Sequence, residues 1–162
     1  MATCFFIGHR DAPEELLPLI SDAAERLITD CDVTAFYVGG YGAFDRIAGR
    51  AVVVLKKKYS HIRLYRVIAY HPAERPQKAP KGYDGTYYPP GMEEVPHRVA
   101  IPRANQAMIE NSDYLIAYVR HDMLSNSYEV LRYAKRREQK GLMRVTNLAD
   151  AEKLCEINAQ KC

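Results

Sequence analysis

The chain has 162 residues, of which 48% are apolar and 27% charged, as is usual for a single folded domain. Its 23 basic and 20 acidic side chains give a formal net charge of +3, which is too balanced to indicate a nucleic-acid partner. No apolar run approaches the about 20 residues that a membrane helix requires. These observations predict one domain over residues 1–162, with neither a membrane nor nucleic acid as a partner.

Cysteine and histidine give no sign of a metal centre. The four cysteines and five histidines are scattered, without CxxC or HxxxH spacing. The pattern predicts a cytoplasmic protein with free thiols, no metal site and no cofactor. The two densest basic clusters, 56–58 and 135–137, fall near the expected ends of helices, where the helix dipole favours cations.

Short apolar strands alternate along the chain with amphipathic helices. Strands are expected at residues 3–8, 35–38, 62–71, 113–119 and 142–148. Helices are expected at residues 11–30, 44–59, 102–112 and 127–141, with another short helix in the tail. Pro18 either kinks the first helix or marks its true start. Alternation with near-continuous apolar strands predicts an α/β fold: a Rossmann-like, doubly wound, mainly parallel sheet of five strands with helices on both faces.

A segment rich in proline, glycine and tyrosine interrupts this alternation at about 71–101. It is too long for a simple connection, and such segments are commonly lids, binding loops or disordered. Tyr83, Tyr87 and Tyr88 could stack on a base, pack on the domain or form a homodimer contact. Packing or a dimer contact is the preferred interpretation of the three.

Three glycines follow the second strand, at Gly39, Gly40 and Gly42. They would let backbone amides approach a ligand, and they precede a helix whose N-terminus favours an anion. They could equally serve only a tight turn and close packing between strand and helix. The spacing matches neither the dinucleotide fingerprint nor the phosphate loop, so both interpretations stay open.

The end of the first strand shifts the balance toward a ligand. Gly8 there places His9 and Arg10 at the upper edge of the sheet. Arg10 could bind a phosphate or carboxylate, and His9 could donate a hydrogen bond or a proton. The alternative for Arg10 is an ion pair with a carboxylate such as that of Asp45.

The segments CFFIGHR, YVGGYGAFDRIAGRAVVVLKKKY, NQAMIENSDYLIAYV and YEVLRYAKRR resemble, in order, the YpsA-like branch of the SLOG superfamily. That superfamily includes the DprA-type DNA-processing proteins and the Lonely Guy phosphoribohydrolases. The resemblance spans residues 3–148. It implies a Rossmann-like sheet that binds a nucleotide or nucleotide-derived ligand above its strands.

Carried over residue by residue, the resemblance implies a ligand site built from several loops. The first loop matches at Gly8, His9 and Arg10, and the second at Gly39, Gly40, Gly42, Phe44 and Asp45. Phe44 is better explained as a core anchor, and Asp45 either accepts a ribose hydroxyl or occupies the first turn of a helix. Asn105 matches an asparagine that usually follows an arginine directly, whereas here Arg103 lies one place earlier.

The largest departure from the family follows the fourth strand. Ser125 and Asn126 stand where glycines are common, and Arg132 stands where the phosphoribohydrolases carry a glutamate. A carboxylate there would stabilise the positive charge that builds up on the ribose, so its replacement argues against that reaction. Glu129 lies one helical turn earlier. Ser125, Asn126 and Ser127 could still donate hydrogen bonds to a phosphate.

The sequence thus favours a module that binds a nucleotide-derived small molecule, as a sensor or a sequestering protein. A nucleotide N-glycoside hydrolase is the first alternative, with His9, Asp45 or Glu129 as weak candidates for acid–base catalysis. A protein-interaction module with a vestigial pocket is the second. Binding of single-stranded DNA ranks below these because the chain lacks a basic stripe.

Overall fold

The computed structural model describes residues 1–121 and 125–150. Within them, six parallel strands form one sheet in the order β4-β3-β2-β1-β5-β6. The strands are β1 (Ala2–Gly8), β2 (Val33–Val38), β3 (Arg63–Val67), β4 (Gly85–Tyr87), β5 (Tyr114–Tyr118) and β6 (Arg144–Asn147). The α-helices are α1 (Leu17–Cys31), α2 (Ala43–Lys58), α3 (Ala100–Glu110) and α4 (Asn126–Gln139). The predicted Rossmann-like α/β class is confirmed.

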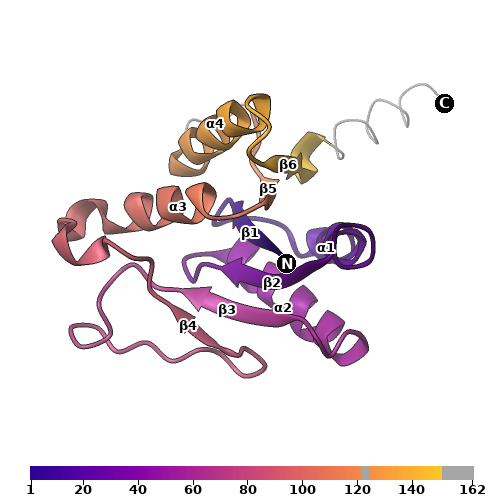
Figure 1. Cartoon of the computed structure of the whole chain (residues 1–162), viewed down its shortest axis with the longest axis horizontal. Coiled ribbons are helices and arrows are strands. Elements are labelled where there is room, and N and C mark those ends of the chain that lie inside the picture. Colours follow the sequence, from indigo (N-terminus) through magenta and orange to yellow (C-terminus); the bar gives the residue numbers. More distant parts are fainter. Residues whose placement is uncertain (122–124, 151–162) are drawn as a thin grey trace.

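Both faces of the sheet are covered, because neighbouring residues of each central strand enter different cores. Cys4 and Phe6 of β1 pack in the core under α1 and α2, whereas Phe5 and Ile7 pack in the core under α3 and α4. In Figure 1, α3 and α4 lie together, apart from α1 and α2. The near-continuous apolar run of β1 follows from this double burial.

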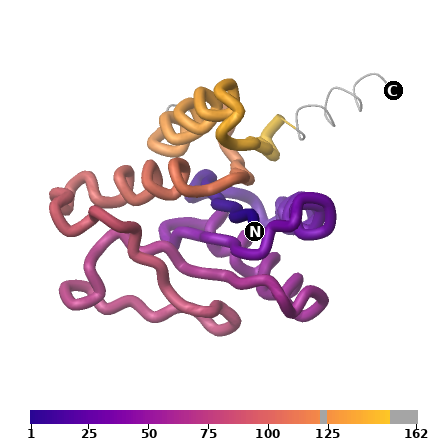
Figure 2. Tube along the Cα trace, in the orientation of Figure 1, coloured from indigo at the N-terminus to yellow at the C-terminus, as the bar shows by residue number. Residues whose placement is uncertain are grey.

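The predicted count of five strands was wrong, and the sixth strand comes from the insert. β4 is only three residues long and pairs in parallel with β3, with Tyr65 opposite Gly85. The carboxylate of Asp84 fixes the start of this strand by accepting hydrogen bonds from Leu64 N, at 2.8 Å, and Lys56 Nζ, at 2.6 Å. Figure 2 shows the insert looping out and returning alongside β3.

The tyrosines of the insert pack on the domain itself. Tyr87 meets Tyr37 of β2 edge to face, with ring centroids 5.1 Å apart, and Tyr88 meets His71 in the same way at 5.5 Å. The Tyr83 hydroxyl lies against Gly49 in the middle of α2. These contacts account for all three rings, and a homodimer through this segment stays a prediction.

The ends of the helices follow local chemistry. Pro18 lies in the first turn of α1, just after a 3₁₀ turn at Glu14–Leu16, so the helix begins there and does not kink. α4 ends at Gln139, and Gly141 then adopts a left-handed conformation with φ of 73°. The short helix expected in the tail falls outside the described residues.

The order in which successive strands are added to the sheet reverses between β1 and β5. From β1 the strand order runs outward through β2 to β4 on one side, and through β5 to β6 on the other. In such sheets ligands bind at the carboxyl ends of the strands, near this reversal. The loops after β1 and β5 flank this reversal, and the loops after β2 and β3 lie farther along the same edge of the sheet.

Candidate ligand-binding site

The loops after β1 and β2 are joined through their backbones. Ala43 N, at the first position of α2, donates a hydrogen bond to Arg10 O at 3.0 Å. A Cβ atom on Gly42 would lie 2.7 Å from Arg10 Cα, so only glycine permits this approach. One amide at the start of α2 is thus already used within the protein, while the Arg10 side chain is exposed.

Gly8 serves the core. A Cβ atom at this position would overlap the ring of Phe44, which is fully buried. That ring also lies near Phe6 and Tyr118, with centroid distances of 6.5 and 6.4 Å. Phe44 is the core anchor expected from the sequence, and Gly8 makes room for it.

The carboxylate of Asp45 lies within the glycine turn, against Gly39 and the backbone of Tyr41. Its Oδ2 accepts a hydrogen bond from Tyr41 N at 3.0 Å, and a Cβ on Gly39 would lie 2.9 Å from the same oxygen. Burial raises the pKa of Asp45 from 3.8 to about 6, against the opposing effects of the Tyr41 amide and the charges of Arg66 and Arg10. An internal anion therefore takes the place that the sequence offered to a phosphate.

A cavity of about 520 Å³ opens directly beside this turn, between α2 and the residues of the insert that precede β4. Four cationic side chains line it: Arg46, Arg50, Arg66 and Lys81. The other described lining residues carry no carboxylate; they are Gly40, Gly42, Val53, Val54, Pro80 and Tyr83. A site of this size and charge fits a small organic anion.

Arg66 forms the inner end of the cavity. It belongs to β3 and shares with Leu64 the face of the strand that is turned toward α2. Its guanidinium fills the space over Gly40, with Nη2 3.5 Å from Gly40 O. Its Nε is buried and has no hydrogen-bond partner among the described residues.

Arg46 and Arg50 lie one turn apart on α2, and Glu14 bridges them from the loop after β1. Its two carboxylate oxygens lie 2.7 Å from Arg46 Nη2 and 2.9 Å from Arg50 Nη1. Hydrogen bonds from Arg46 and then Arg50 hold the pKa of Glu14 below its usual value. All three side chains are about half exposed, so the bridge can open toward a competing anion.

The opposite wall of the cavity is fixed to α2. Lys56 Nζ donates hydrogen bonds to Gly82 O at 2.8 Å and to Asp84 Oδ2 at 2.6 Å. The Tyr83 hydroxyl rests on Gly49, and burial raises the pKa of Tyr83. The cavity is therefore built by intramolecular contacts alone.

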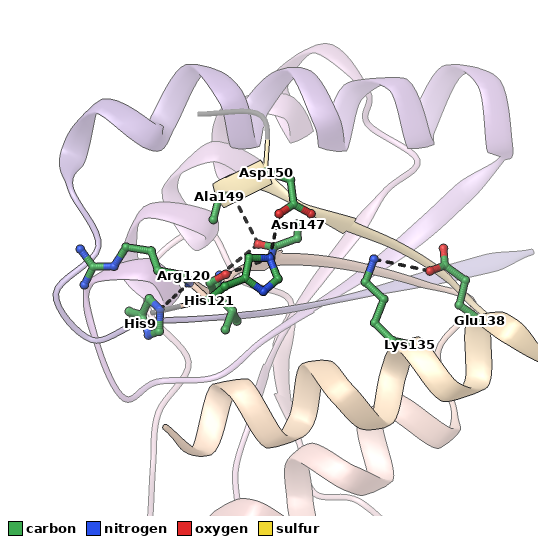
Figure 3. Close-up of polar contacts among 9 residues, drawn as sticks. His9, Arg120, His121, Lys135, Glu138, Asn147, Ala149 and Asp150 are labelled. Carbon is green, nitrogen blue, oxygen red and sulfur yellow. Dashed lines mark hydrogen bonds and ion pairs between the residues drawn. The ribbon is translucent and has the colours of Figure 1, made fainter. Parts of the chain in front are cut away.

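His9 has a structural role at the end of β1 (Figure 3). Its ring is buried, and Nε2 accepts a hydrogen bond from Arg120 N at 2.8 Å. Its own backbone N donates to Tyr118 O at 3.2 Å. A ring nitrogen that accepts a hydrogen bond carries no proton, so His9 is neutral here and ties β1 to the end of β5.

Two of the three residues predicted at the start of α4 are engaged in backbone contacts. Ser125 Oγ accepts a hydrogen bond from Tyr128 N at 3.2 Å, which makes it the N-cap of the helix. Ser127 Oγ donates to Gly8 O at 3.3 Å and so brings the start of α4 to the end of β1. The structure thus gathers the loop at 8–10, the glycine turn and Ser127 at one edge.

The other predicted residues lie elsewhere. Asn126 and Glu129 line a groove of about 380 Å³ between α3 and α4, on the opposite face of the sheet from α2. Arg103 is exposed and lines a separate cavity of about 160 Å³ beside Met92. Asn105 lies on α3, on the helix face that it shares with Ile101 and Ile109. These positions are not joined to the cavity beside α2.

Sequence reasoning missed the cations of the cavity. Arg66 did leave a signal, because it is a charged residue on the strand face that it shares with the apolar Leu64, which is fully buried. Arg46 and Arg50 have the spacing of one helical turn. Lys81 left none, since its position depends on how the insert folds back on α2. Tyr83, which lines the same cavity, was singled out in the sequence as a ring that could stack on a base or pack on the domain.

Comparisons with known proteins leave the family open. No protein-family model and no curated protein matches the chain. Within residues 1–121 and 125–150, no group of three or more His, Cys, Asp or Glu side chains could hold a metal ion. The same part of the chain contains no helix long and apolar enough to cross a membrane.

Proposed function

We propose that this protein binds a nucleotide or a nucleotide-derived ligand at the carboxyl edge of its sheet and acts as a sensor or sequestering module. The observation that carries the proposal is the cavity beside the glycine turn, which the Arg66 side chain lines from β3. Three further cations line the same space. A phosphate is the common biological anion that such a set of guanidinium and ammonium groups recognises.

The anion would be held by side chains more than by the backbone. Two amides of the glycine turn are already committed, Tyr41 N to Asp45 and Ala43 N to Arg10. Asp45 also places a negative charge where a phosphate would otherwise meet the start of α2. This arrangement directs the ligand along the flank of α2, toward Arg46 and Arg66.

Hydrolysis of a nucleotide N-glycoside is the second candidate. Asp45 favours it, although this carboxylate lies in the glycine turn beside the cavity and does not line it. A carboxylate whose pKa is about 6 can exchange protons near neutral pH. Glu129 lies in the groove between α3 and α4, so it cannot act on a ligand in the same cavity. The neutral His9 is held by Arg120 N. Asp45 would therefore act without a second titrating group from the predicted set.

Native mass spectrometry of the freshly purified protein tests binding, followed by calorimetric titration with AMP, ADP, NAD and cyclic AMP. Arg66→Met should lower the affinity for the bound nucleotide about tenfold or more, as expected for a charge-assisted hydrogen bond. Arg63→Met, on an exposed position of the same strand, is the matched control and should bind like wild type. Release of free base that disappears in Asp45→Asn would establish the hydrolase. A protein that binds none of these nucleotides overturns the proposal in favour of the interaction module.

A further inference from the structure

The cavity beside α2 differs in chemistry from one end to the other. Its cationic end lies at the edge of the sheet, where Arg66 covers Gly40 and Arg46 begins the second turn of α2. Its apolar end lies farther along the helix, at Val53 and Val54. The lining residues of α2 at positions 46, 50, 53 and 54 share one helix face, so the two ends form one continuous stripe.

The insert supplies the facing wall of the apolar end. Gly82 lies against Val53, since a Cβ atom there would come 2.8 Å from Val53 Cγ1. Pro80 and Lys81 precede it and line the same cavity. Lys56 holds this segment through Gly82 O, so the wall that faces Val53 is fixed to α2.

Val54 lines the cavity with a side chain that is largely open to solvent. Its side chain is 60% exposed, one of the most exposed large apolar side chains among residues 1–121 and 125–150. Its neighbours at 56–58 on the same helix are all lysines. An exposed apolar residue in a cavity that four cations also line is suited to covering the face of a flat, weakly polar ring.

From the difference between the cationic and the apolar end of the cavity we infer the orientation of a bound nucleotide. This inference rests on the proposed function. Its phosphate lies against Arg66 and Arg46 at the edge of the sheet, and its base lies at the apolar end of the cavity, against Val53 and Val54. The ligand class is thus a nucleotide whose base contributes to affinity, as distinct from a sugar phosphate or a free phosphate chain. Glu14 must release Arg46 when the phosphate enters.

Calorimetric titration of AMP and ribose 5-phosphate into wild type, Val54→Ser and Arg66→Met tests this orientation. In wild type, AMP should bind about tenfold or more tightly than ribose 5-phosphate, because the base buries apolar area. Val54→Ser should weaken AMP about threefold to tenfold while leaving ribose 5-phosphate unchanged. Arg66→Met should weaken both ligands alike. Leu142→Ser, which removes an apolar side chain of similar exposure outside the cavity, is the control for Val54→Ser.

Three results can be told apart. The orientation is supported if AMP binds more tightly than ribose 5-phosphate, if Val54→Ser weakens AMP alone, and if Arg66→Met weakens both ligands. Binding of AMP that depends on Arg66 but not on Val54, or equal binding of AMP and ribose 5-phosphate, overturns the orientation and leaves nucleotide binding intact. Absence of binding for every ligand of both panels, in a protein that melts cooperatively, overturns the orientation and the proposed function together.

Discussion

The backbone N–H of Tyr41 donates a hydrogen bond to Oδ2 of Asp45 over 3.0 Å, so a partly buried carboxylate closes the glycine turn ahead of α2. Helix N-termini favour acidic groups, and Asp45 belongs to the first turn of this helix. Its burial nevertheless costs more than these contacts return, since the pKa is raised to about 6. The charge at this position is thus unfavourable to folding.

Asp45→Asn should stabilise the protein at neutral pH. A pKa raised from 3.8 to about 6 corresponds to about 3 kcal/mol, which the wild type loses as the pH rises from 4 through 6. The asparagine side-chain oxygen can still accept the Tyr41 N–H, so the variant keeps the contact without the charge. Urea unfolding should show equal stability near pH 4 and an advantage of up to about 3 kcal/mol for the variant at pH 7.

Asp22→Asn is the control for this comparison. Asp22 is exposed on α1, so its replacement should change stability by less than about 0.5 kcal/mol at either pH. An Asp45→Asn variant less stable than wild type at pH 7 would mean that the ionised carboxylate stabilises the turn, contrary to the raised pKa.

Glu14→Gln should strengthen anion binding. The two oxygens of Glu14 hold Arg46 and Arg50 from the side of the β1 loop, and an incoming phosphate must compete with them. Neutralising this carboxylate should raise the affinity for pyrophosphate about twofold to fivefold, the range that exposed ion pairs provide. Glu15→Gln removes the same charge from the neighbouring exposed residue and should raise the affinity less. Weaker binding in Glu14→Gln would assign Glu14 the task of holding the arginines in place.

The sequence was sufficient for the architecture because the signals of the fold are local. Runs such as that of β1, buried on both faces, and the helical spacing of α2 predict a covered parallel sheet without any tertiary information. β4 escaped prediction because three residues, the first of them a glycine, carry too little pattern. Its strand character comes from Asp84, whose contacts with Lys56 and Leu64 are made across the fold.

The candidate site was predicted only at the level of the edge of the sheet. The glycines were identified, but the groups that fill the space above them are Phe44 over Gly8, Asp45 over Gly39 and Arg66 over Gly40. Which side chain covers a glycine depends on packing between distant segments, and one sequence contains no direct record of it. The sequence left open whether the glycine turn serves packing or approaches a ligand. In the structure it serves packing and also borders the cationic cavity.

Gly40→Ala tests whether this glycine makes room for Arg66. The new methyl group would overlap the guanidinium, which can swing away because it is the end of a flexible side chain. Stability should fall by less than about 1 kcal/mol, whereas AMP affinity should fall about tenfold as Arg66 leaves its position. In an Arg66→Ala background the same substitution should change neither quantity further. Equal losses of AMP affinity in both backgrounds would show that Gly40 acts through its own backbone.

Asn147→Ala should destabilise the pairing of β5 with β6 (Figure 3). Its buried side chain accepts hydrogen bonds from Val119 N at 3.0 Å and Ala149 N at 3.3 Å, and it donates to Val119 O at 2.9 Å. Alanine leaves both backbone groups of the fully buried Val119 without their partner, at a cost of about 2 to 4 kcal/mol. Thr146→Ala, at an exposed position of the same strand, should cost less than about 1 kcal/mol. Urea unfolding gives both values, and hydrogen exchange at the Val119 amide should accelerate in Asn147→Ala alone. An Asn147→Ala variant as stable as Thr146→Ala, with a protected Val119 amide, would show that this end of β5 is held by other contacts.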